Sequence, residues 1–131
     1  MIVSDANREA VGLPKRTLLL VEDEILVRIF IAEILRDEGF EVLEAATSEE
    51  ALRQFRAHPR ISLVVSDVKM PGPIDGVQLS FAIKALEPHK PLILVSADFD
   101  LGTPHSADVF LPKPFQPAEL IFLIKQAISA K

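Results

Sequence analysis

The chain has 131 residues, a length that fits one domain with a substantial hydrophobic core. Its formal net charge is −5 and it has no Lys/Arg cluster, so we expect no direct binding to nucleic acid. The absence of cysteine excludes disulfides and thiolate metal sites. No apolar stretch approaches the ~18 residues of a membrane span. We therefore expect a cytoplasmic globular protein without a membrane partner.

The first half of the chain begins with an irregular segment and then alternates. Residues 1–16 show no periodicity and are expected to form a flexible N-terminal arm. The continuous apolar run Thr17–Val21 is typical of a strand buried on both faces. Glu24–Glu38 has apolar residues at helical spacing, and Gly39 is a natural C-terminal stop for that helix. Glu41–Leu43 is expected to be a short second strand.

The second half continues the alternation. Thr47 and Glu50 have the spacing of a capping box, which predicts a helix to about Ala57. The later predicted elements are, in chain order, a strand Ile61–Ser66, a helix Gly76–Leu86, the strands Leu92–Val95 and Asp108–Leu111, and a helix from Pro117 to about Ala130. The repeated strand–helix order predicts an α/β fold, a doubly wound five-stranded parallel sheet with helices on both faces.

Polar residues follow the predicted strands where each strand ends. They are Glu22, Asp23, Asp67, Ser96 and Lys113. Ligand sites of open parallel sheets form at the carboxyl ends of the strands, so we expect these side chains to converge on one crevice. Each of them alone is as readily an ordinary surface or capping residue. Together, three carboxylates, a hydroxyl and an ammonium suit a divalent cation, expected to be Mg²⁺, and a phosphoryl group that Asp67 accepts as an acyl phosphate.

From Thr17 to Ala130 the sequence resembles the receiver domain of two-component response regulators, in the CheY-like superfamily. The motifs that carry the resemblance are Leu-Val-Glu22-Asp23-Glu24, Asp67-Val-Lys-Met-Pro71 followed by Asp75-Gly76, Val95-Ser96-Ala97, and Leu-Pro-Lys113-Pro114-Phe115. The resemblance implies a flavodoxin-like fold with strand order 2-1-3-4-5. It also implies a receiver domain over residues 17–131 that works as a stand-alone response regulator.

The resemblance implies roles for the acidic residues. Asp67 would accept a phosphoryl group from a sensor histidine kinase or a histidine phosphotransfer protein. Mg²⁺, with Mn²⁺ as the alternative ion, would bind Glu22, Asp23, Asp67 and the backbone carbonyl of Lys69. Such a domain catalyses only its own phosphorylation and dephosphorylation and is otherwise no enzyme. It would signal by contact with an unknown downstream protein, or act as a phosphate shuttle or sink.

The resemblance also implies how the phosphoryl group is bound and sensed. Ser96 and Lys113 would bind it, and the peptide bond between Lys113 and Pro114 would be cis. Phe110 stands at the position of the switch aromatic, which turns inward when Ser96 moves. Because Phe110 has no hydroxyl, such a switch would work by packing alone, and a permanent core position is an equal alternative.

Two regions depart from the family pattern or remain to be explained. The stretch between Ser96 and Lys113 is short and contains Gly102 and Pro104, so we expect the fourth helix of the family to be short or replaced by a loop. Lys69 and Asp98 could form an ion pair across the mouth of the site, or remain two solvated charges. The apolar run Leu120–Ile124 exceeds one helix face and suggests a homodimer or docking interface, unless the arm or a neighbouring loop covers it.

Three other functions compete with this interpretation. A hydrolase of the haloacid-dehalogenase type needs an aspartate two positions after the nucleophile, where this chain has Lys69. A flavodoxin-like FMN protein shares the architecture, but Glu22, Asp23 and Glu24 would repel the FMN phosphate. A degenerate receiver that works without phosphorylation would not need the complete acidic set.

Overall fold

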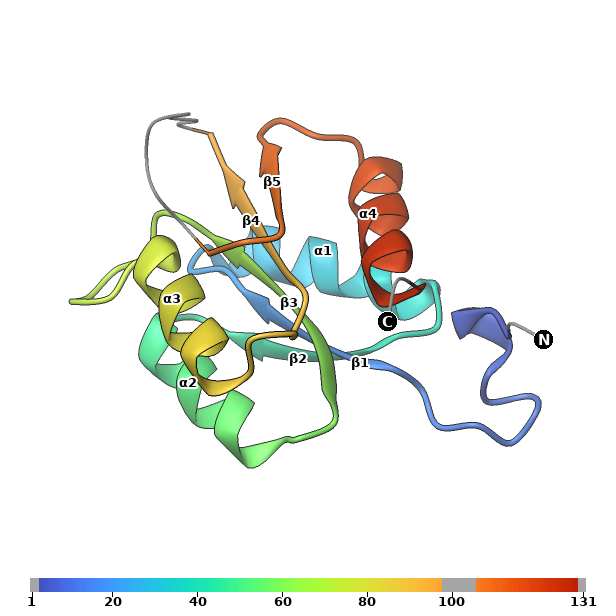
Figure 1. The fold of residues 1–131 in the computed structure, drawn as a ribbon. Coiled ribbons are helices and arrows are strands. Elements are labelled where there is room, and N and C mark those ends of the chain that lie inside the picture. Colours follow the sequence, from blue (N-terminus) through green and yellow to red (C-terminus); the bar gives the residue numbers. More distant parts are fainter. Residues whose placement is uncertain (1–2, 98–105, 130–131) are drawn as a thin grey trace.

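The computed structural model describes residues 3–97 and 106–129 (Figure 1). Its strands are β1 (Thr17–Val21), β2 (Glu41–Ala45), β3 (Ile61–Asp67), β4 (Leu92–Ser96) and β5 (Val109–Pro112). Its α-helices are α1 (Ile25–Asp37), α2 (Ser48–Ala57), α3 (Gly76–Leu86) and α4 (Pro117–Ser129). Every strand and helix expected from the sequence is present, with bounds that move by no more than two residues.

The five strands form one parallel sheet in the order β2-β1-β3-β4-β5, so the predicted flavodoxin-like fold class is confirmed. The order reverses at β1, where the chain has built one edge of the sheet and crosses to build the other. The carboxyl ends of β1 and β3 are neighbours at this switch point. In a doubly wound sheet that is where ligands bind.

The side chains of β1 show why the central strands are mostly apolar. Leu18 and Leu20 belong to a core that α1 and α4 complete, whereas Leu19 and Val21 belong to a second core under α2 and α3. Successive side chains of a strand point to opposite faces of the sheet. With helices packed on both faces (Figure 1), most side chains on either face are apolar, and all five residues of β1 are buried.

Local hydrogen bonds start α2 and α3 where the sequence predicts. Thr47 accepts a hydrogen bond from the backbone N–H of Glu50 at 3.1 Å. Asp75 and Gln78 form a reciprocal capping box, in which the Asp75 side chain accepts from the Gln78 N–H and the Gln78 side chain accepts from the Asp75 N–H. Both caps satisfy backbone donors that a helix start leaves free.

The described part of the N-terminal arm contacts the turn after α1. Residues Asp5–Asn7 form one 3-10 turn, in which Asp5 is buried. Gly39 has a φ of +96°, and a Cβ atom there would lie 2.5 Å from the Cα of Ala6. Arg16 pairs with Asp5 at 3.6 Å. The arm therefore has a defined docking place, and its flexibility stays a prediction.

The connection from β4 to β5 contains residues 98–105, which lie outside the described residues. The predicted loss of the fourth family helix and the suggested pair of Lys69 with Asp98 both fall there. On the described side of this gap, the Ser106 N–H donates to Ser80 Oγ on α3 at 3.1 Å. Lys84 of α3 pairs with Asp108 at 2.7 Å, so the chain enters β5 tied to α3.

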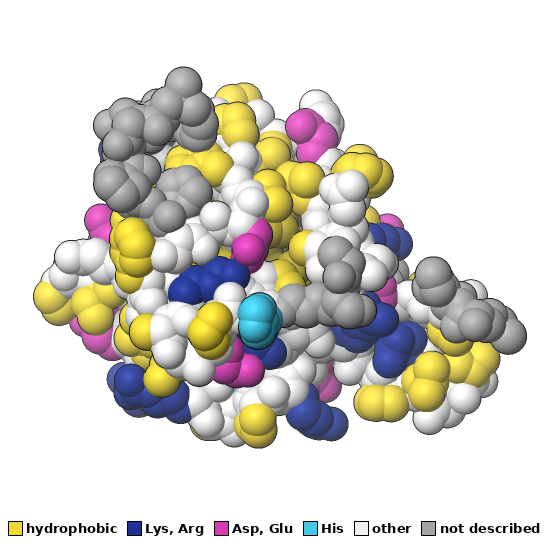
Figure 2. All heavy atoms as spheres, in the orientation of Figure 1, with side chains coloured by type: hydrophobic (Ala, Val, Ile, Leu, Met, Phe, Trp, Pro, Cys, Tyr) yellow, Lys and Arg dark blue, Asp and Glu magenta, His cyan; other side chains and the backbone are white. Residues whose placement is uncertain are grey.

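The surface on the side of α3 and α4 carries hydrophobic side chains in separate groups among charged ones (Figure 2). Phe81 on α3 and Phe122 on α4 are exposed. The exposure of Phe122 agrees with the expectation that the apolar run of the last helix cannot be buried completely. Among residues 3–97 and 106–129, no helix has the length and apolar character needed to cross a bilayer.

Candidate functional site

Three carboxylates meet at the switch point of the sheet. Glu22 follows β1 directly, Asp23 is next to it, and Asp67 is the last residue of β3. One carboxylate oxygen from each of the three lies within 4.8 Å of the others. Glu22 is only 3% exposed and Asp23 is exposed, so the cluster reaches from the protein interior to the surface. The structure thus brings together all three carboxylates that the sequence placed at strand ends.

Hydrogen bonds fix the acidic turn between β1 and α1. The Glu22 N–H donates to the Ala45 carbonyl of β2 at 3.0 Å, which extends the parallel ladder by one residue. The Glu24 N–H donates to Glu22 Oε2 at 3.1 Å. Arg28, one helical turn into α1, donates from Nη1 to the Glu22 carbonyl at 2.8 Å. Both the backbone and the carboxylate of Glu22 are therefore held in place.

Lys113 joins the carboxylates from the end of β5. Its Nζ donates to Asp67 Oδ2 at 2.7 Å and to Glu22 Oε1 at 3.2 Å. Its backbone N–H donates to the Ser96 carbonyl at 2.9 Å, which continues the β4–β5 pairing past β5. The peptide bond between Lys113 and Pro114 is cis, the isomer that the family resemblance implies.

Burial and charge act against each other at this cluster. Burial raises the pKa of Glu22 above its ordinary value, although the Glu24 N–H and the Lys113 ammonium oppose the rise. For Lys113, burial alone would lower the pKa, but the hydrogen bonds and charges of Asp67 and Glu22 outweigh it and raise the pKa. The ammonium therefore stays protonated and offsets part of the negative charge that the carboxylates concentrate.

The remaining predicted site residues follow β3 or lie on β4 and β5. The Lys69 N–H donates to Asp67 Oδ1 at 3.2 Å, so each oxygen of that carboxylate has one donor. Ser96 ends β4 beside β3 and is buried. Phe110 is half-buried and packs against the core under α2 and α3. This position fits both interpretations of Phe110, the switch aromatic and the permanent core residue.

Two residues shape the site in ways that were not predicted from the sequence. Gly76 begins α3 so close to β3 that a Cβ atom there would lie 2.0 Å from the Asp67 carbonyl oxygen. The second is Arg28, whose side chain holds the Glu22 carbonyl. The position of Arg28, four residues after Glu24, could have indicated this contact, because residues i and i+4 share a helix face and α1 follows the acidic turn directly.

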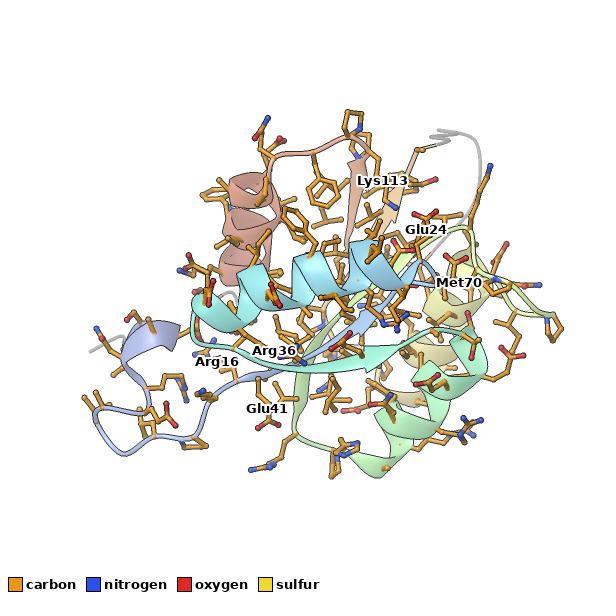
Figure 3. All side chains as sticks on the ribbon, turned by 180° about the vertical axis from the view of Figure 1, so that it is seen from behind. Arg16, Glu24, Arg36, Glu41, Met70 and Lys113 are labelled. Atoms are coloured by element: carbon orange, nitrogen blue, oxygen red, sulfur yellow. The ribbon has the colours of Figure 1, made fainter. Side chains whose placement is uncertain are left out.

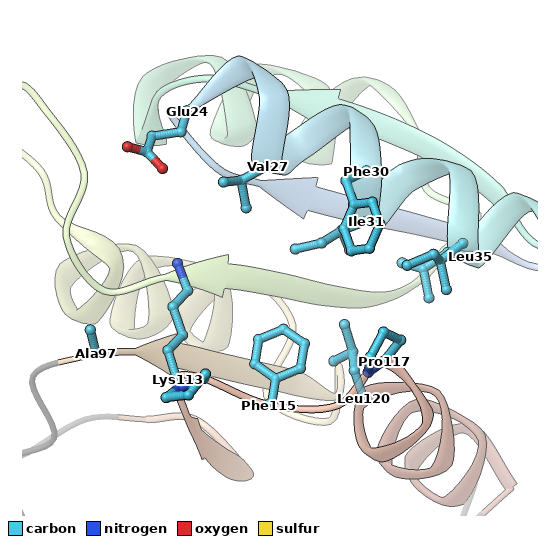
Figure 4. Close-up of a pocket in the computed structure, with 12 residues that line it drawn as sticks. Glu24, Val27, Phe30, Ile31, Leu35, Ala97, Lys113, Phe115, Pro117 and Leu120 are labelled. Atoms are coloured by element: carbon cyan, nitrogen blue, oxygen red, sulfur yellow. The ribbon is translucent and has the colours of Figure 1, made fainter.

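An apolar groove of about 510 Å³ opens beside the cluster, between α1 and the segment that joins β5 to α4 (Figure 4). Val27, Phe30 and Ile31 face it from α1. Phe115 and Leu120 face it from the other side, and Lys113 stands at one end. Phe30 is 60% exposed. The groove therefore offers apolar surface that leads to the carboxylate site.

Carboxylate oxygens are hard ligands of the kind that Mg²⁺ prefers, so the three acidic residues fit this ion. An ammonium beside them can bind the oxygens of a phosphoryl group. Fold and site together define a doubly wound α/β domain with an acidic site at the switch point of its sheet. The sequence model described as "Response regulator receiver domain" matches residues 18–125, and the chain belongs to this family.

Curated relatives agree with this assignment. The chain is 37% identical over 120 residues to the transcriptional regulatory protein PdtaR of Mycobacterium tuberculosis, with 87% of this chain and 57% of that protein covered. It is 34% identical over 116 residues to a putative NtrX-like response regulator of Rickettsia bellii, with 84% of this chain and 24% of that protein covered. The chain therefore spans little more than half, or about a quarter, of the length of these relatives.

Solved structures show the same fold. A receiver domain protein from Clostridium thermocellum superposes with a TM-score of 0.82 at 31% identity, covering 87% of this chain and 94% of that one. The response regulator TrrA from Thermotoga maritima, crystallised with Mg²⁺ and BeF, superposes with a TM-score of 0.79 at 31% identity, covering 86% and 98%. As a receiver domain, the chain is a phosphoacceptor of two-component signalling.

Proposed function

We propose that Asp67 is the phosphoacceptor of this receiver domain and that it takes the phosphoryl group from a phosphohistidine of a sensor kinase or a phosphotransfer protein. The observation that carries the proposal is the contact of Lys113 with Asp67, within a cluster that includes Glu22 and Asp23. This contact pairs one Asp67 oxygen with the Lys113 ammonium, and the Asp67 side chain keeps 12% of its surface exposed.

In the proposed reaction an Asp67 oxygen forms a new bond to phosphorus. The phosphorus–nitrogen bond of the phosphohistidine breaks, and its electron pair returns to the imidazole. The product is an acyl phosphate, which needs charge neutralisation because it adds negative charge to an acidic site. In this proposal Lys113, which contacts Asp67, neutralises the phosphoryl oxygens, and Ser96 at the end of β4 donates a hydroxyl hydrogen bond to them.

Glu22, Asp23 and Asp67, together with the backbone carbonyl of Lys69, are the proposed ligands of Mg²⁺, with Mn²⁺ as an alternative ion. When bound, Mg²⁺ supplies positive charge that offsets the repulsion between the carboxylates and the phosphoryl group. Other groups of the protein hold the proposed ligands in position. Arg28 and the Glu24 N–H hold Glu22, and the Lys69 N–H holds Asp67.

The groove beside the site is the proposed docking place of the phosphodonor. It is apolar, it lies between α1 and the segment after β5, and it ends at Lys113 (Figure 4). An amphipathic helix that carries the phosphohistidine could bury its apolar face there and present the imidazole to Asp67. A kinase or phosphotransfer protein with such a helix is therefore the partner we expect.

For its output we propose contact with an unknown downstream protein, or service as a phosphate shuttle or sink; both fit a receiver domain. Phe122 on α4 is 63% exposed and supports a protein contact there, including a homodimer through that helix. We further propose that the domain acts in the cytoplasm and catalyses only its own phosphorylation and dephosphorylation.

The test is incubation with acetyl phosphate and Mg²⁺, followed by intact mass measurement. We expect the wild-type protein to gain the mass of one phosphoryl group, and Asp67→Asn to gain none. Asp37→Asn changes an exposed carboxylate at the end of α1 and serves as the matched control, which should gain the same mass as wild type. A wild-type protein that stays unmodified, or an Asp67→Asn variant that is modified equally, would contradict the proposal.

A further inference from the structure

Arg28 connects the acidic turn to the sheet from the first turns of α1. Its side chain is only 15% exposed. Nη1 donates to the Glu22 carbonyl at 2.8 Å, and Nε donates to Glu44 Oε1 of β2 at 3.2 Å. Its backbone N–H donates to the Glu24 carbonyl at 2.9 Å. One residue therefore holds both ends of the turn that carries Glu22 and Asp23.

Glu44 is itself held firmly. Arg36, two turns further along α1, donates to Glu44 Oε2 at 3.1 Å and to the Val42 carbonyl at 2.8 Å. The Glu44 carbonyl accepts from Gln54 Nε2 of α2 at 2.6 Å. Gln54 holds the backbone of Glu44 independently of Arg36, so the anion that pairs with Arg28 keeps its place when Arg36 is replaced.

We propose that Arg28 is a positioning residue for the metal ligands, because its guanidinium holds the Glu22 carbonyl and so sets where the carboxylates of Glu22 and Asp23 lie. The inference rests on the proposed function, in which these carboxylates bind Mg²⁺. The ligands sit in a short turn between β1 and α1, where rotation of the Glu22 peptide would move both side chains. Replacing a partner that orients a metal ligand typically lowers metal affinity by about 10- to 100-fold.

The geometry requires arginine rather than any cation. The planar fork of a guanidinium donates in two directions at once, here to a carbonyl and to a carboxylate. A lysine ammonium at the end of a flexible stem carries the same charge without the fixed fork. Arg28→Lys therefore keeps the charge and loses the double contact.

Charge and positioning predict opposite signs for Mg²⁺ affinity. A positive group near a metal site repels the ion, so a pure charge effect makes Arg28→Ala bind Mg²⁺ more tightly and leaves Arg28→Lys unchanged. Positioning makes both variants bind more weakly. Arg36→Ala is the matched control, since it removes a second cation from the same Glu44 carboxylate. Arg36 lies near the opposite end of α1 from Glu24, away from Lys113 (Figure 3).

The experiment measures the Mg²⁺ dissociation constant of the full chain from amide chemical shifts, with the stability of each variant measured by urea unfolding without Mg²⁺. We expect Arg28→Ala to raise the dissociation constant about tenfold, the lower end of the range for residues that orient metal ligands. Arg28→Lys should raise it by several-fold. Arg36→Ala should change it by less than about twofold, since Arg36 does not contact the acidic turn.

A dissociation constant of Arg28→Ala within about twofold of wild type, or lower, would overturn the inference, as would an equal loss in Arg36→Ala. If Arg28→Ala does not fold, Arg28→Lys decides by the same criterion. Failure of the proposed function is a separate result, because a wild-type protein with no Mg²⁺-dependent shifts and no modification by acetyl phosphate would reject the site itself.

Discussion

Lys113 Nζ lies 2.7 Å from Asp67 Oδ2, so the ammonium already holds the carboxylate that we propose as phosphoacceptor. The same nitrogen lies 3.2 Å from Glu22 Oε1. Lys113 thus joins the end of β5 to the ends of β1 and β3, across the switch point of the sheet. A single cation from one edge of the sheet stabilises two carboxylates at its centre.

Replacing Lys113 by methionine should destabilise the metal-free protein by about 1–3 kcal/mol, because two buried acceptors lose a charged donor. Addition of Mg²⁺ should restore more stability in Lys113→Met than in wild type, since a bound cation offsets the repulsion between the carboxylates that no longer have the ammonium beside them. Urea unfolding with and without Mg²⁺ measures both effects.

Lys125→Met is the matched control for Lys113→Met. It removes an ion pair of 2.9 Å with Glu38 at a more exposed position and should cost at most about 1 kcal/mol, with no Mg²⁺ dependence.

The raised pKa of Glu22 predicts a pH dependence with a definite sign. The largest cause of the raised pKa is burial of the carboxyl group, so the folded protein holds the Glu22 proton more tightly than the unfolded chain does. The ionised carboxylate therefore costs stability above the raised pKa, and this cost vanishes below the ordinary value of 4.5.

Glu22→Gln should consequently unfold at a higher urea concentration than wild type at pH 7 without Mg²⁺. The difference should shrink as the pH falls and should vanish below 4.5, where the wild-type carboxyl is protonated in both the folded and the unfolded state. With Mg²⁺ the order should reverse, because the variant lacks a metal ligand. Glu33→Gln, at an exposed position of α1, is the control. Equal midpoints of Glu22→Gln and wild type at every pH would contradict the prediction.

Gly76→Ala should destabilise the protein by about 2–4 kcal/mol, because the added methyl would lie 2.0 Å from the Asp67 carbonyl oxygen and force α3 away from β3. Gly12→Ala provides the comparison. Gly12 has a φ of +81° but open space around its Cβ position, so only backbone strain of about 1 kcal/mol is expected there. Thermal or urea unfolding of the two variants checks the ranking, and a Gly76→Ala protein as stable as Gly12→Ala would show that α3 can shift freely.

Phe30→Asp should slow phosphotransfer from a phosphorylated histidine phosphotransfer domain by at least about tenfold, since a charge in the groove opposes burial of an apolar helix. Modification by acetyl phosphate should stay unchanged, because that small donor needs no docking surface. Phe122→Asp alters a phenylalanine of similar exposure, 63% against 60%, on α4.

Phe122→Asp should leave phosphotransfer intact. If α4 is a dimer interface, sizing of the phosphorylated protein should show a dimer for wild type that is absent for Phe122→Asp. A Phe30→Asp protein that receives the phosphoryl group at the wild-type rate would place the phosphodonor elsewhere.

The order of helices and strands could be predicted from the sequence because its signals are local. Apolar runs such as Thr17–Val21 mark strands buried on both faces, and caps such as Thr47 mark helix starts. The candidate site followed from one further rule, that parallel strands present their carboxyl ends at the same edge. Asp67 and Lys113 could be grouped in this way although 46 positions separate them.

Other features depend on how separate elements approach one another. The residues around Gly76 in the sequence do not predict that the Asp67 carbonyl lies where a Cβ atom would be. Likewise, the residues around Gly39 do not predict its close approach to Ala6. The apolar residues of α1 predict a helix, but the groove exists only because the segment after β5 stops short of covering Phe30.

Local signals in the sequence were enough to predict the α/β class, the chain order of the elements and the identity of the polar residues at the strand ends. The folded structure was needed to show that Lys113 contacts both Asp67 and Glu22, that Arg28 holds the acidic turn, and that an apolar groove leads to the site. The physical reason is that periodicity and capping act within one element, whereas these contacts depend on the packing of several elements around the sheet.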